Sequence, residues 1–185
     1  MTNEKYEKYL NAFKPSDKLL EKHINDLKKS GIDEVTALEL GFRTSVASDS
    51  WVVPIRNIEN TETLGYVARY DNEAIEENKY PSKKKNTTPK YRLSPELRNS
   101  FFYPHIKSVN WLKIAKDSTL DIGMTEGIKK AIKLTLEGFP TIGLFATYGW
   151  IGKNQEEESK ENGGLDNDEL DSEEDESEDK ENEEE

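Results

Sequence analysis

Apolar and polar positions change their spacing twice between residues 120 and 145. Apolar side chains first take every second position, as in a half-buried strand: Leu120, Ile122 and Met124. From Ile128 onward they recur three or four residues apart, as on one face of a helix, until Gly138 ends the run. Thr141–Phe145 is extended and apolar again. The pattern predicts a βαβ unit whose two strands, Leu120–Thr125 and Thr141–Phe145, are parallel and adjacent.

Upstream of this unit, helical spacing predicts two short helices. The first opens at Ser16, a plausible N-cap, and closes at Gly31, and the second covers roughly Asp33 to Leu40. Two helices joined this way could be a helix-turn-helix that reads DNA, or an ordinary helical hairpin that packs on a sheet. The second helix is acidic where a DNA reader would be basic, which favours the helical hairpin.

Strand-like runs lie between the helical hairpin and the βαβ unit. Trp51–Arg56 and Leu64–Tyr70 predict a β-hairpin. Residues 72–89 lack apolar periodicity and predict a mobile loop. Shorter extended or helical pieces are expected before residue 120: Tyr91–Leu93, Phe101–Tyr103 and Val109–Ala115. The expected fold class is therefore α/β, with an α+β N-terminal part.

Charge divides the 185-residue chain into two parts. Residues 155–185 hold eighteen acidic side chains and two lysines, a net charge of −16, whereas residues 1–154 carry +4. The acidic part has too few apolar side chains to offset the entropy of ordering, which predicts a disordered tail. We therefore expect a flexible N-terminus at 1–15, one domain at 16–153 and a disordered acidic tail at 154–185.

Composition also indicates in which cellular compartment the protein is expected. The absence of cysteine excludes disulfides and thiolate zinc sites, and it fits a reducing compartment. The first residues lack the apolar core of a signal peptide, and no apolar run reaches the ~20 residues of a membrane helix. A soluble, cytoplasmic protein is expected.

Glu126 is the leading candidate for chemistry. It follows the first strand of the βαβ unit, at the carboxyl edge where α/β sheets bind ligands. Lys129 and Lys130 follow in the first turn of the helix, whose N-terminus favours anions. The alternatives are structural: Glu126 could stabilise the helix dipole, and the two lysines could form a solvated face with Lys133.

Several short motifs, taken in order, resemble a Toprim-like domain of uncharacterised function that accompanies replication primases and helicases of phages and plasmids. The strongest is Thr125-Glu126-Gly127 followed by Lys129-Lys130-Ala131. Looser similarities extend over roughly residues 19 to 150: Leu27–Ile32, Val53-Pro54-Ile55, Ala68–Asp71, Lys79-Tyr80, Tyr91 and Phe102-Tyr103-Pro104.

The resemblance implies a role in DNA replication and Mg²⁺-dependent phosphodiester chemistry, with Glu126 as the catalytic acid–base group beside the metal. The family's pattern continues with a helix and a strand that ends in an Asp-x-Asp metal pair. Here the globular pattern stops near Lys153, and Asp166-Asn167-Asp168 has no apolar strand before it. The chain therefore resembles a C-terminally truncated member, and we expect only weak Mg²⁺ binding, because a lone carboxylate holds this ion poorly.

Basic and aromatic side chains elsewhere indicate nucleic-acid contact. The combination suits a single strand, which needs positive charge for its backbone and rings for its bases. The residues in question, in and after the expected loop, are Lys83, Lys84, Lys85, Tyr91 and Arg92. Arg69 could clamp a phosphate or form a structural ion pair with Asp71. His23, on an apolar helix face, is expected to be a packed core residue.

Three readings of function remain open at this point. The first is a nucleic-acid- or phosphate-binding module of a replication system, with single-stranded DNA and a replication helicase or primase as partners. The second is a non-catalytic accessory or inhibitor protein whose acidic tail mimics DNA and binds a basic partner. The third is a fragment of a longer primase.

Overall fold

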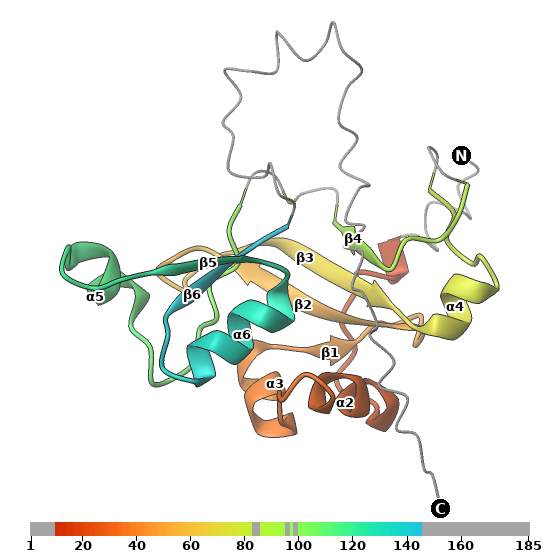
Figure 1. Cartoon of the computed structure of the whole chain (residues 1–185). Helices are drawn as coiled ribbons and strands as arrows, with labels where there is room; N and C mark the ends of the chain where they lie inside the picture. The colour runs from red at the N-terminus through yellow and green to blue at the C-terminus, as the bar shows by residue number, and fades with distance from the viewer. Residues whose placement is uncertain (1–9, 83–85, 95–96, 98–99, 146–185) are drawn as a thin grey trace, which may run out of the picture.

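The computed structural model describes residues 10–82, 86–94, 97 and 100–145. Within these residues, five helices and six strands form a four-stranded antiparallel sheet and a separate two-stranded parallel sheet. One apolar core joins the two parts. It takes side chains from three helices, α2 (Glu21–Lys28), α3 (Glu34–Leu40) and α6 (Ile128–Leu136), and from strand β2 (Ser50–Arg56). Figure 1 shows how these elements are arranged. The mixed α/β class expected from the sequence is confirmed.

The helical hairpin consists of α2 (Glu21–Lys28) and α3 (Glu34–Leu40). Asp33 caps α3 by accepting the Thr36 N–H at 2.7 Å, and hydrogen bonding to Thr36 lowers the pKa of the Asp33 carboxyl. Buried side chains of both helices join the main core, so the hairpin packs on the sheet as expected. The first helix begins later than expected, because Ser16 donates its N–H to the Thr44 carbonyl, outside the helix.

The antiparallel sheet has the order β1 (Arg43–Thr44), β2 (Ser50–Arg56), β3 (Thr63–Tyr70) and β4 (Tyr91–Leu93). The predicted β-hairpin is confirmed as β2 and β3, which pair antiparallel with an irregularity at the end of β2. The two-residue β1 has no pattern from which it could be predicted. Strand β2 is buried on both faces, so it is the centre of the fold.

The two faces of β2 pack against different parts of the chain. Trp51 and its alternate neighbours face the main core, whereas Val52 packs with Phe13 and Ala68. Ala12 and Phe13 have exposed fractions of 0 % and 4 %. The packed part of the chain therefore begins before residue 16, where the domain boundary was expected.

The segment 72–89, expected to be a mobile loop, contains a helix, α4 (Asn72–Glu76). Tyr80, further along the segment, stacks on Tyr70 with 4.7 Å between ring centroids. Its hydroxyl donates to Asp49 at 2.8 Å, and burial together with this carboxylate raises the pKa of the Tyr80 phenol. Aromatic contacts thus order a segment in which the helical period was too short to recognise.

The βαβ prediction is confirmed in its topology. Strands β5 (Gly123–Glu126) and β6 (Thr141–Leu144) are adjacent and parallel, and α6 (Ile128–Leu136) connects them. Helix α5 (Trp111–Lys116) precedes them, close to its expected position.

Two details of the unit differ from the prediction. The first strand begins at Gly123 rather than Leu120, and its alternate apolar side chains are not half-buried. Met124 is 56 % exposed, and Leu120 and Ile122 are 45 % and 44 % exposed. Period-2 spacing predicted a strand here correctly. It could not show that the face with Ile122 and Met124 is left largely exposed by the rest of the described chain.

A pair of glycines tests how closely the helical hairpin packs on the sheet. Gly41 (φ 87°) and Gly138 (φ 92°) both have left-handed backbones, but only at Gly41 would a Cβ meet another residue, Pro54 Cγ at 2.9 Å. Gly138→Ala should therefore cost about 1 kcal/mol of backbone strain, and Gly41→Ala distinctly more. Chemical denaturation measures both. Equal losses of unfolding free energy in the two variants would show that Pro54 of β2 moves aside at no energetic cost.

Candidate functional site

The candidate site lies at the carboxyl edge of the parallel sheet. Glu126 is the last residue of β5 and pairs with Leu144 of β6. Gly127 then reverses the chain with φ 92° and ψ 137° and donates its N–H to the Leu144 carbonyl at 3.1 Å. A Cβ on Gly127 would have no atom within 4 Å, so it is the backbone conformation that requires glycine here. Glu126 and the start of α6 thus meet at this edge, as predicted.

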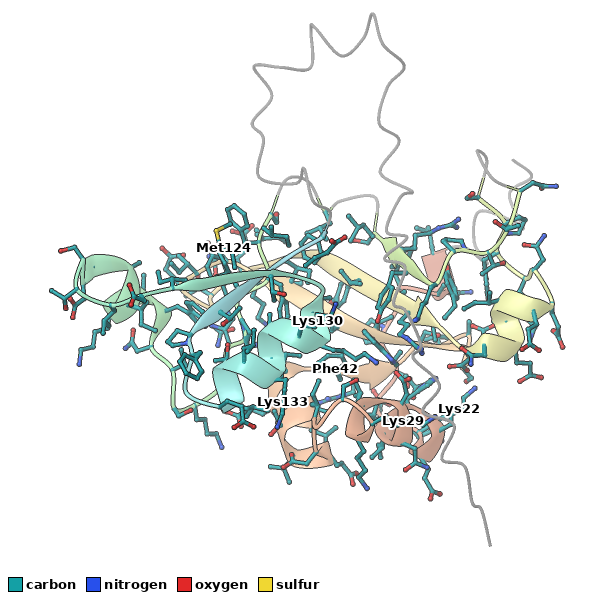
Figure 2. All side chains as sticks on the ribbon, viewed as in Figure 1. Lys22, Lys29, Phe42, Met124, Lys130 and Lys133 are labelled. Carbon is teal, nitrogen blue, oxygen red and sulfur yellow. The ribbon has the colours of Figure 1, made fainter. Side chains whose placement is uncertain are left out.

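Helix α6 begins without a side-chain cap. Its first turn therefore presents backbone N–H groups that lack an acceptor within the helix. Lys129 and Lys130 are in this turn. Lys130 is exposed, and the Lys129 side chain is only 19 % exposed because it extends toward α2. Figure 2 shows Lys130 and Lys133 along α6, and below them Lys22 on α2 and Lys29 directly after it.

The Lys129 side chain reaches a carboxylate that the sequence analysis overlooked, that of Asp26. Lys129 Nζ lies 3.7 Å from Asp26 Oδ2, which also accepts the Trp51 indole N–H at 2.9 Å. Arg69 Nη1 lies 3.2 Å from the other oxygen, Oδ1. One carboxylate on α2 therefore joins β2, β3 and α6.

Arg69 forms a structural ion pair, but with a different partner from the one predicted. It was expected to pair with Asp71, two residues away, and instead pairs with Asp26. The Arg69 side chain is 11 % exposed, and its guanidinium lies 5.9 Å from the centre of the Tyr91 ring. Buried in this way, Arg69 cannot extend to a phosphate without leaving Asp26.

Asp71 has a separate set of partners at the end of β3. It accepts hydrogen bonds from Lys22 and from His23, whose Nε2 lies 2.9 Å from Asp71 Oδ1. The other ring nitrogen of His23 lies 2.8 Å from Thr44 Oγ1. Burial alone would raise the pKa of Asp71, but these partners together lower it. His23 is 1 % exposed, as expected for a packed core residue.

The remaining predicted binding residues do not converge on one surface. Arg92 is buried and donates to the Tyr80 carbonyl at 3.3 Å, so it anchors the segment before β4. Tyr91 alternates with it on β4 and contacts Trp51 edge-on. Lys83, Lys84 and Lys85 lie outside the described residues. The structure brings together Arg69, Tyr91 and Lys129 around Asp26, and leaves Arg92 apart.

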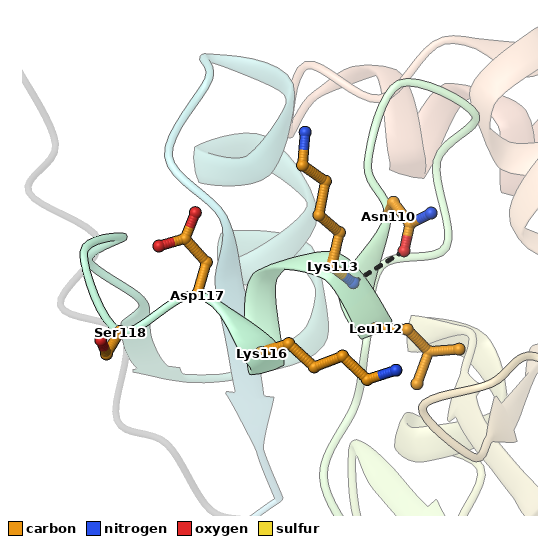
Figure 3. A pocket seen from close by; sticks show the side chains of 6 residues that line it. All are labelled: Asn110, Leu112, Lys113, Lys116, Asp117 and Ser118. Carbon is orange, nitrogen blue, oxygen red and sulfur yellow. Dashed lines mark hydrogen bonds between the residues drawn. The ribbon is translucent and has the colours of Figure 1, made fainter.

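A surface hollow of about 620 Å³ lies away from this edge, beside α5 (Figure 3). A single stretch of chain lines it, with the residues Asn110, Leu112, Lys113, Lys116, Asp117 and Ser118. Asn110 caps α5 by accepting the Lys113 N–H at 2.9 Å. Its described lining residues all come from this one stretch, whereas the edge at Glu126 joins two strands and a helix, so we place the candidate site at Glu126.

Magnesium is the metal that the sequence suggested for Glu126. It needs hard oxygen ligands, and it commonly takes only one or two protein carboxylates together with waters and phosphates. In the part of the chain that the structure describes, no three His, Cys, Asp or Glu side chains are grouped so that they could hold a metal. No catalytic step through a metal is derived from this geometry.

Comparison with known proteins assigns the chain to no family. No family model matches the chain, and searches of curated proteins and of solved structures found no match. Among the described helices, none has the length and apolar character needed to span a membrane.

The Asp26 carboxylate should be the polar contact on which the fold most depends. Asp26→Ala would leave the Arg69 charge buried without its partner, which should lower the free energy of unfolding by about 3 kcal/mol. Asp26→Asn, which keeps one acceptor oxygen, should cost less. Urea denaturation measures both changes.

Glu137→Ala is the matched control for Asp26→Ala. It also removes a carboxylate from a lysine of α6, but both partners, Lys133 and Glu137, are about half exposed. The unfolding midpoint should hardly move, because exposed pairs contribute little. Equal effects of Asp26→Ala and Glu137→Ala would contradict the central role of Asp26.

Proposed function

We propose that this chain is a Toprim-like module that binds the phosphate backbone of single-stranded nucleic acid, in association with DNA replication in a phage or plasmid. One observation carries the proposal: the β5–α6–β6 unit is parallel, with Glu126 at its carboxyl edge and two lysines in the first turn of α6. Sheets of this kind bind ligands at that edge. A replication primase or helicase is the proposed partner.

The proposed contact is electrostatic and independent of sequence. Lys130, exposed at the uncapped end of α6, is the side chain best placed to meet a phosphate. Lys129 supports the site from the side of Asp26, and Arg69 holds Asp26 in place. Arg69 is thus proposed as a supporting residue and not as a phosphate clamp.

Metal-dependent catalysis is not part of the proposal. A single glutamate at the sheet edge can bind Mg²⁺ only weakly until phosphates of a substrate complete the shell. Cytoplasmic localisation remains an expectation from composition alone.

Charge reversal in α6 tests the proposed contact. Lys130→Glu should weaken binding of a fluorescent oligothymidylate several-fold at low salt. It should also reduce the slope of log K against log salt by about 1, as expected for the loss of one phosphate contact. Fluorescence anisotropy of the full chain across a salt series measures both quantities.

Lys116→Glu is the matched control, since it reverses one exposed charge in α5, which precedes the parallel unit. It should change the affinity much less than Lys130→Glu does. Equal weakening by the two variants would mean that overall charge, and not the edge of the sheet, attracts the strand.

The charge of residues 155–185 favours a second candidate function. With a net charge of −16, this segment could imitate a phosphate backbone and engage a basic partner, as in an accessory or inhibitor protein. It could also compete in cis with nucleic acid for the lysines of the body, because a short tether gives a local concentration of millimolar order.

Removing residues 155–185 distinguishes these roles. If the segment competes in cis, its removal should strengthen single-strand binding most at low salt. The gain should fade as the Debye length shortens from about 30 Å at 0.01 M to about 10 Å at 0.1 M. Identical binding with and without the segment, at every salt concentration, would rule out the competition.

A further inference from the structure

Three groups from three elements share the Asp26 carboxylate, and they do not hold it equally. The Trp51 indole N–H donates to Oδ2 at 2.9 Å, and Arg69 Nη1 lies 3.2 Å from Oδ1. Lys129 Nζ lies 3.7 Å from Oδ2, which is beyond the distance of an N–H···O hydrogen bond. Of the three contacts, the ion pair with Lys129 is therefore the loosest.

These four residues, which we call the Asp26 cluster, carry more positive than negative charge. Two members are cations, Arg69 and Lys129, and one is a carboxylate, Asp26. The three charged side chains are 11 %, 19 % and 20 % exposed, so water screens them less than it screens charges on the open surface. An excess of positive charge in such surroundings attracts an anion.

The cluster adjoins the end of α6 at which the candidate site lies. Lys129 is the second residue of α6 and Lys130 is the third. Neighbouring residues of a helix point about 100° apart, and here Lys129 extends toward α2 whereas Lys130 is exposed. A phosphate held by the backbone N–H groups of this first turn would therefore meet Lys130 on one side and the pair of Lys129 and Asp26 on another.

Lys129 can change its partner at a lower cost than Arg69 can. If Lys129 leaves, the Asp26 carboxylate keeps the Trp51 N–H and the Arg69 guanidinium, so no buried charge loses its last partner. If Arg69 left, its guanidinium would have to give up both Asp26 and the Tyr91 ring. The ammonium of a lysine is also carried on a flexible four-carbon stem, which allows it to turn from one anion to another.

We propose that Lys129 is a second phosphate-binding residue, which exchanges Asp26 for a phosphate oxygen when nucleic acid reaches the edge of the sheet. Asp26 is then the counter-ion that holds Lys129 in the absence of a ligand, and this competition limits the affinity. The inference rests on the proposed function, because it concerns the same end of α6. It adds a second lysine to the contact and a carboxylate that regulates it.

Neutralising Lys129 tests the contact. Lys129→Gln should weaken binding of a fluorescent oligothymidylate to the full chain several-fold at low salt, and it should reduce the slope of log K against log salt by about 1. The urea midpoint should hardly move, because Asp26 keeps its two closer partners. Fluorescence anisotropy across a salt series and urea denaturation measure these effects.

Neutralising Asp26 tests the competition. Asp26→Asn keeps an oxygen for the Trp51 N–H but removes the charge that holds Lys129, so it should strengthen oligothymidylate binding several-fold at low salt. In the Lys129→Gln background the same substitution should bring no gain. Glu137→Gln is the matched control, because it also removes a carboxylate from a lysine of α6, Lys133, and it should leave the affinity nearly unchanged.

Two results would overturn this inference alone. The first is a Lys129→Gln variant that binds with unchanged affinity and salt slope but unfolds at lower urea, which would make Lys129 a structural brace. This result is decisive even if Asp26→Asn fails to fold. The second is an equal gain from Asp26→Asn with and without Lys129, which would reflect overall charge. If the unaltered chain does not bind oligothymidylate at low salt, the proposed function fails and this inference fails with it.

Discussion

A single carboxylate, that of Asp26, connects the two halves of this fold. It accepts the Trp51 indole N–H from the central strand, lies 3.2 Å from the Arg69 guanidinium and 3.7 Å from the Lys129 ammonium. Without it, the largely buried side chains of Arg69 and Lys129 would face each other across the junction. The position of α6, and with it the edge that carries Glu126, therefore depends on a residue of the helical hairpin.

This dependence has a functional consequence. The cations nearest the candidate site are not equivalent, because Asp26 offsets the charge of Arg69 and part of that of Lys129. Lys130, on the same turn of α6, is the more exposed of the two lysines. A phosphate at the edge of the sheet would thus meet one exposed lysine, the backbone of the first turn of α6 and a glutamate that repels it. Modest affinity with a shallow salt dependence follows from that arrangement, because few phosphates are neutralised.

Much of the fold could be predicted from local patterns. The helical hairpin, the β-hairpin and the βαβ unit each carry their period and their glycines within a short stretch of sequence. What could not be predicted depends on contacts between distant residues. Arg69 was assigned to Asp71 because the two are close in sequence, whereas Asp26 is 43 positions earlier and lies on the polar side of α2. The exposure of Met124 and Ile122 could not be predicted either, since alternation does not reveal which side of a strand is covered.

The central claim is that nucleic acid meets the chain at the carboxyl edge of the β5–β6 sheet. Titration of the ¹⁵N-labelled full chain with an oligothymidylate at low salt, followed by amide chemical shifts, tests it most directly. The account predicts the largest changes in Glu126, Gly127 and the first turn of α6, and small changes in α5. Changes confined to α5, or spread evenly over all exposed lysines, would contradict it.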